Sequence, residues 1–89
     1  MSLFPLGQVV ATPGALAFLA ERSITPITLL RRHVGGDFGD IDEQDTKANV
    51  QAIQQDTRVF SSYKFPNGRV WVITEADRSS TCLLLPDEY

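Results

Sequence analysis

Residues 58–86 constrain the fold more than any other part of the chain. Two β-rich runs, 59–65 and 70–73, flank Pro66-Asn67-Gly68, which is the signature of a β-hairpin. A polar turn at 75–80 then leads into a run with three consecutive leucines, a pattern typical of a strand that is covered on both faces. This segment therefore predicts a three-stranded antiparallel meander.

The turn of the hairpin leaves two registers open. Asn67-Gly68 favours a two-residue type I′ turn, whereas Pro66-Asn67-Gly68 favours a three-residue turn closed by a glycine at positive φ. We expect the three-residue turn, because the fixed φ of proline suits its first position. In that register Tyr63 pairs with Trp71, and a single face carries Val59, Tyr63, Phe65, Trp71 and Ile73.

Two Thr-Pro pairs predict helix starts in the N-terminal half. At Thr12-Pro13 and Thr25-Pro26 the threonine suits the N-cap, and the proline suits the first helical position, where a missing N–H has no cost. Gly35-Gly36 ends the second helix. Acidic residues at 42–45 then favour the start of a third, mostly polar helix.

The predicted fold class is α+β, in a single domain that covers residues 1–89. We expect a small antiparallel sheet, formed by the C-terminal meander and a short valine-rich strand at 8–11, packed against two or three helices. The other face of the sheet then needs a partial cover, supplied by the N-terminal segment or by a partner. Tyr89 is expected to dock on the sheet or on a partner, and Trp71 to lie in the core.

Composition excludes several classes of function. With eight basic against eleven acidic residues and a net charge of −3, this small acidic protein is not expected to bind nucleic acid directly, and its basic residues are interpreted as scattered surface charges. The single cysteine, Cys82, excludes an internal disulfide and a cysteine-rich zinc site. No apolar run approaches a membrane span, and no signal peptide is recognisable, so we expect a cytoplasmic protein without a cofactor.

His33, Asp37 and Asp40 form the first group of side chains with chemical potential. A histidine beside two carboxylates on a glycine-rich loop is able to bind a divalent metal or to transfer protons, as in a small metal-dependent hydrolase or nuclease. We favour a structural interpretation, in which the histidine stabilises a helix end and the aspartates form tight turns. No second histidine at metal-ligand spacing supports zinc.

Glu75, Asp77 and Arg78 form the second group, on the turn that follows the hairpin. A charged loop held by rigid strands is a common recognition device. We expect this turn and the loop with Asp37 and Asp40 to lie together at one end of the sheet and to bind a protein partner.

Four stretches carry a family resemblance that spans nearly the whole chain. They are residues 4–15, residues 32–40 without Gly35, residues 71–79, and Leu85-Pro86-Asp87-Glu88-Tyr89. Together they resemble a group of small bacterial proteins found on plasmids and integrated mobile elements, labelled "plasmid-related protein" or type I restriction system subunit. The resemblance implies a mobile-element setting, with a host defence or DNA-processing protein as a partner. A chain of 89 residues without an Asn-Pro-Pro-type motif cannot supply a methyltransferase domain.

The sequence thus favours a non-enzymatic protein-interaction module, an accessory that counters host defence or restriction. Two alternatives stay open at this point. One is the metal-dependent hydrolase that uses His33, Asp37 and Asp40. The other is a structural homodimer that pairs through an apolar edge at residues 82–85.

Overall fold

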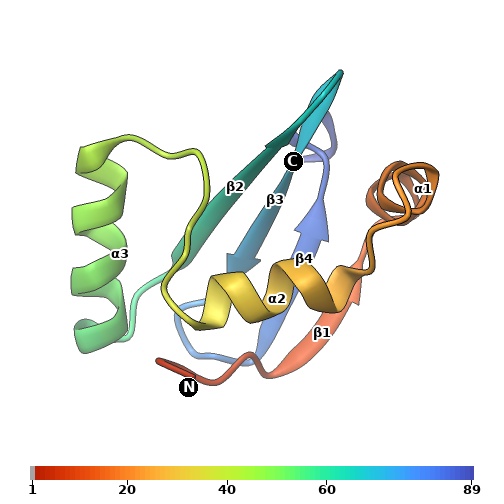
Figure 1. Ribbon diagram of the computed structural model, residues 1–89. Helices are drawn as coiled ribbons and strands as arrows, with labels where there is room; N and C mark the ends of the chain where they lie inside the picture. The colour runs from red at the N-terminus through yellow and green to blue at the C-terminus, as the bar shows by residue number, and fades with distance from the viewer. Residues whose placement is uncertain (1) are drawn as a thin grey trace.

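The computed structural model describes residues 2–89. Its elements follow in the order β1 (Gln8–Ala11), α1 (Pro13–Glu21), α2 (Pro26–Val34), α3 (Glu43–Gln55), β2 (Val59–Phe65), β3 (Gly68–Thr74), β4 (Ser80–Leu84) and a short 3-10 turn, η1 (Pro86–Glu88). The four strands form one sheet, and α2 crosses one of its faces (Figure 1). Ala15 and Leu19 of α1 pack into the core on the same face. The α+β class is confirmed, with a strand or helix at each predicted place.

Side-chain caps explain where two of the helices begin: Thr12, which the sequence predicted as a cap, and Asp42, which it predicted only as part of an acidic helix start. The Thr12 hydroxyl accepts a hydrogen bond from the Ala15 amide at 3.1 Å, and the Asp42 carboxylate accepts one from the Asp45 amide at 2.7 Å. Thr25 also precedes a helix, but its hydroxyl bonds the Thr28 hydroxyl and leaves the backbone uncapped. There the proline at the first helical position carries the start signal.

The sheet is mixed, in the order β1-β4-β3-β2. The C-terminal meander is antiparallel as predicted, but β1 runs parallel to β4, with Val10 beside Cys82. Three helices separate β1 from the meander along the chain. A segment of this length can carry the chain back across the sheet, so β1 and β4 can be parallel, which a tight hairpin turn would not allow. This placement puts β4 in the interior of the sheet. Residues 82–85 are therefore not an edge of the sheet, which removes the surface on which the homodimer alternative depended.

The hairpin register differs by one residue from the expected one. Phe65 pairs with Gly68, so the turn contains only Pro66 and Asn67, and Asn67 has a φ of 67°. Asparagine tolerates this left-handed conformation after a proline, as in a type II turn. Tyr63 therefore pairs with Val70, and Trp71 lies opposite Ser62.

A shift of one residue moves side chains to the other face of the sheet. The inner face, which packs against α1 and α2, contributes Tyr63, Val70, Val72 and Leu83 to the main core. Trp71 lies on the opposite, outer face with Phe60 and Ile73. Tyr89 covers part of this face by packing against Trp71, which confirms that it docks on the sheet. The N-terminal segment, by contrast, packs on the inner side, where Phe4 contacts His33.

The free edge of β2 is closed by groups from α3 and the loop before it. The side chain of Asn49 donates to the Phe60 carbonyl at 2.6 Å and accepts from the Phe60 amide at 3.0 Å. The loop then pairs with Ser62, whose amide donates to Phe38 and whose carbonyl accepts from Asp40. The carboxylate of Asp40 accepts from the Lys64 amide at 3.0 Å. Each outward-facing residue of β2 from 60 to 64 is thereby bonded, which blocks strand addition on this side.

No helix within residues 2–89 combines the length and the apolar character that a bilayer crossing requires.

Asn49→Ala should lower the free energy of unfolding by about 1–3 kcal/mol, because it removes both partners of Phe60 from a nearly buried position. Chemical denaturation of the variant measures this loss. Gln51→Ala, an exposed change on the same helix, is the matched control and should leave stability within about 0.5 kcal/mol of the parent. Equal stability of the two variants would contradict a sealing role for Asn49.

Candidate functional site

His33 lies on α2 and is completely buried against the sheet. Its Nδ1 is 2.6 Å from the Ser61 hydroxyl oxygen, and its Nε2 is 2.9 Å from the Thr74 hydroxyl oxygen. The rings of Phe4 and Phe38 meet the imidazole at 5.2 Å and 6.5 Å between centroids. The histidine is thus a bridge between α2 and strands β2 and β3.

The donor and acceptor roles in this hydrogen-bond chain follow from its last member, the Thr81 hydroxyl. The Thr81 hydroxyl donates to the Leu6 carbonyl at 2.7 Å, so it can only accept from the Thr74 hydroxyl, which is 2.7 Å away. Thr74 must then accept from Nε2 of His33. Nε2 of the imidazole therefore carries a proton. Because burial lowers the pKa of His33 to about 4, the ring is neutral near pH 7, and Nδ1 accepts from Ser61.

This environment excludes His33 as a metal ligand. Burial lowers the pKa of its imidazole to about 4, and both ring nitrogens are engaged in the hydrogen-bond chain. Across residues 2–89, no three histidine, cysteine, aspartate or glutamate side chains converge as a metal site. In this geometry His33, Asp37 and Asp40 do not come together as the metal site of the hydrolase alternative.

The two aspartates of the glycine-rich loop have structural partners. Asp37 accepts from the Arg32 guanidinium at 2.7 Å and from the Gly39 amide at 3.1 Å, and the bond from Arg32 lowers the pKa of its carboxyl. Its carbonyl accepts from the Tyr63 hydroxyl at 2.7 Å. Burial raises the pKa of Tyr63 to about 12, so this phenol remains a donor. Asp40 caps Lys64 on the β2 edge, so the predicted binding loop is part of the edge closure.

Arg78 on the β3–β4 turn is also a structural clamp. Its guanidinium donates to the carbonyls of Ala52 at 2.8 Å and Thr57 at 2.6 Å, which satisfies the end of α3. Asp77 accepts from the Ser79 amide and hydroxyl, which lowers the pKa of its carboxyl, and Glu75 pairs with Arg58.

The structure does not bring the two predicted loops together. Asp40 contacts Lys64, which pairs with Arg69 near the hairpin turn. Glu75 follows Thr74, at the other end of the same strand pair. The five candidate binding residues thus form two separate structural groups, near opposite ends of the β2–β3 pair.

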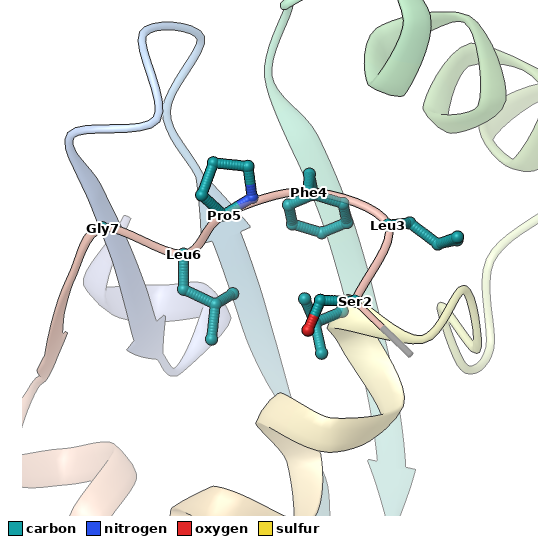
Figure 2. A pocket seen from close by; sticks show the side chains of 7 residues that line it. Ser2, Leu3, Phe4, Pro5, Leu6 and Gly7 are labelled. Carbon is teal, nitrogen blue, oxygen red and sulfur yellow. The ribbon is translucent and has the colours of Figure 1, made fainter.

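A hollow of about 560 Å³ lies under the N-terminal arm, lined by residues 2–7 and Val34. Figure 2 shows the arm passing over this hollow, with Leu6 and Pro5 pointing in opposite directions. The lining has no charged side chain, and the buried ring of Phe4 holds the arm against His33. This hollow results from the docking of the arm, and its lining offers no titratable or metal-ligating side chain for catalysis.

The outer face of the sheet presents an aromatic cluster. Trp71 meets Phe60 edge-to-face at 5.2 Å between ring centroids, and Tyr89 at 5.8 Å. The Arg58 guanidinium donates to the Tyr89 hydroxyl at 2.7 Å and lies 3.3 Å from the Glu75 carboxylate. Tyr89 is 72% exposed, so most of its ring lies on the surface of the protein.

Two cations share this face near the hairpin turn. Lys64 and Arg69 are directly paired across β2 and β3, and alternation along the strands puts them on the same side as Phe60 and Trp71. Arg69 donates to the Ser62 hydroxyl at 3.0 Å. Within residues 2–89, neither cation forms a salt bridge. A second hollow, of about 340 Å³, adjoins Arg69 and is lined by Phe18, Asn67, Gly68, Arg69, Leu85, Pro86 and Asp87.

We define the recognition face as Phe60, Lys64, Arg69, Trp71 and Tyr89. The sequence interpretation treated Lys64 and Arg69 as scattered charges and Trp71 as core. Alternation along β2 and β3 would have grouped these residues once the two-residue turn was chosen, because the correct register aligns Lys64 with Arg69. Searches of protein-family models, curated proteins and solved structures found no match to the chain.

The stability of the protein should fall as the pH drops from about 6.5 to 4. The pKa of His33 is about 4 in the folded state, below its ordinary value of 6.5, so the unfolded chain binds the proton more tightly. The full stability is present above pH 6.5, and about 3 kcal/mol is lost by pH 4. Denaturation curves across this range measure the loss.

Imidazole NMR supplies an independent check, because the chain has one histidine. We expect a neutral ring with the proton on Nε2 at pH 6 and a titration midpoint near pH 4. A midpoint near 6.5 would contradict the buried hydrogen-bond chain.

Proposed function

We propose that this protein is a non-enzymatic protein-interaction module that binds an acidic segment of a partner through the recognition face. The pairing of Lys64 with Arg69, two cations without a carboxylate partner, is the observation that carries this proposal. Like charges directly opposite each other destabilise a strand pair. A carboxylate placed between them relieves this repulsion and forms charge-assisted hydrogen bonds.

The apolar part of the recognition face supports a protein as the ligand. Tryptophan, tyrosine and arginine dominate the energetics of protein interfaces, and this face holds Trp71, Tyr89 and Arg69. The hollow beside Arg69 is lined by the apolar side chains of Phe18, Leu85 and Pro86 together with Asp87, and its volume of about 340 Å³ leaves room for one apolar side chain. The proposed ligand is therefore a segment with a carboxylate next to an aromatic or aliphatic residue.

The hydrolase alternative has less support. His33 is buried with both nitrogens bonded, Asp37 pairs with Arg32, and Asp40 caps a strand edge. Use of these groups in catalysis would require breaking the bonds that hold α2 and the glycine-rich loop to the sheet.

The biological setting rests on the family resemblance of the sequence. A plasmid or integrated mobile element would supply this protein as an accessory, and a host defence or DNA-processing protein would supply the acidic segment. Proteins that handle DNA carry basic surfaces, and acidic segments that cover such surfaces are ligands of the required chemistry.

The fluorescence of Trp71 reports directly on this proposal, because it is the only tryptophan in the chain. Peptides that combine glutamate with leucine or phenylalanine should change its emission, whereas peptides with lysine in place of glutamate should not. Lys64→Glu should lower the affinity for the acidic peptides about tenfold. Lys47→Glu changes the net charge equally on exposed α3 and is the matched control, with affinity near that of the parent.

Two results would overturn the proposal. One is an equal loss of affinity in Lys64→Glu and Lys47→Glu, which would indicate a general charge effect. The other is binding of single-stranded oligonucleotides in place of the peptides, because basic and aromatic residues on a sheet face also suit stacked bases and phosphates.

A further inference from the structure

The two edges of the sheet differ in whether their outward backbone groups are hydrogen-bonded. On β2 the outward amides of residues 60, 62 and 64 and the outward carbonyls of residues 60 and 62 are bonded by Asn49 and by the loop before α3. On β1 the amides of Gln8 and Thr12 donate inward, to Ser79 and Leu83 of the β4 side. Alternate residues of a strand direct their backbone groups to opposite sides, so Val9 and Ala11 direct theirs away from the sheet.

The outward groups of β1 remain open. Within residues 2–89, no backbone group outside the sheet ladder bonds the amide or carbonyl of Val9 or Ala11. Val9 is 44% exposed and Val10 is 42% exposed. The strand Gln8–Ala11 is only four residues long, which limits the length of any pairing, but it has no charge, proline or bulge to prevent it. An open edge on a protein that closes its other edge indicates a site for strand pairing.

We propose that two copies of this chain pair antiparallel through β1, about a two-fold axis at Val10, and form one continuous sheet from the four strands of each copy. This surface is distinct from the recognition face and needs no second ligand.

The symmetry of β1 selects a second copy as the occupant. The open residues, Val9 and Ala11, lie one on each side of Val10. Antiparallel pairing therefore sets Val9 against Ala11 of the second copy as a hydrogen-bonded pair, and the two-fold axis repeats it. Each copy contributes two amides and two carbonyls, so every open group of the edge finds a partner. Because the strand is uncharged, a second copy meets it without repulsion, although the chain carries a net charge of −3.

The side chains add to this match. Val10 stands on the outer face beside Cys82, to which it is directly paired in the sheet. In the proposed dimer it faces Val10 of the second copy as a non-hydrogen-bonded pair, the arrangement in which side chains approach most closely. Two half-exposed valines would thereby be buried against each other.

Sedimentation of the parent protein at about 100 µM should give twice the chain mass of 9.9 kDa. Val10→Lys and Val10→Glu should each be monomeric, because like charges meet at the axis, and an equimolar mixture of the two should restore a dimer. Val50→Lys, at an exposed valine of α3, is the matched control and should remain dimeric. A monomeric parent protein, or dimers of Val10→Lys alone, would overturn the proposal.

A disulfide test fixes the register and stays valid if a charged residue at position 10 prevents folding. In a Cys82→Ser background, Val10→Cys should cross-link to a covalent dimer on mild oxidation, because the two thiols face each other at the axis. Val9→Cys, which faces Ala11 of the second copy, should cross-link poorly. Equal cross-linking at both positions would contradict the proposed pairing. Because these measurements need no peptide, their failure is separate from failure of the recognition face.

Discussion

The register of β2 against β3 determines how the rest of the protein is arranged. With two residues in the turn, Ser61 and Tyr63 face α2, and Trp71 faces outward. Ser61 can then bond His33, and Thr74 lies where it can accept from the same ring. A register shifted by one residue, with Tyr63 still facing the helices, would turn Thr74 away from the buried histidine and bury Trp71 under the helices. The core and the outer surface are therefore set by the same turn.

Most of the polar residues that the sequence indicates as candidate site residues stabilise the fold. Arg78 binds the end of α3, Asp40 closes the edge of β2, and Asp37 fixes the loop through Arg32. A small domain buries limited apolar surface, so its loops need such bonds to stay ordered. Charge and turn chemistry in a loop are thus weak indicators of function here. The cations of the recognition face differ, because neither Lys64 nor Arg69 forms a salt bridge in the part of the chain described.

Local signals made the elements predictable, whereas long-range pairing was not. Thr12-Pro13 and Asp42 act within one helical turn, and the helices begin where these residues place them. The α+β class followed from the order of such elements. The direction of β1, the pairing of Lys64 with Arg69 and the seal formed by Asn49 depend on residues far apart in the chain. Proline and glycine around Asn67 allowed two turns, and the choice between them decided which aromatic residues became accessible.

The unequal edges also limit how large an assembly can grow. Each copy has one edge available for strand pairing, because β1 is open and β2 is bonded to Asn49 and the loop before α3. A protein with two open edges can add copies without end and form a fibre. Here the two β1 strands would be consumed in the first association, and both outer boundaries of the product would be sealed β2 strands. In the proposed dimer, growth would stop at two copies, because the bonded β2 edges would leave no strand open for further pairing.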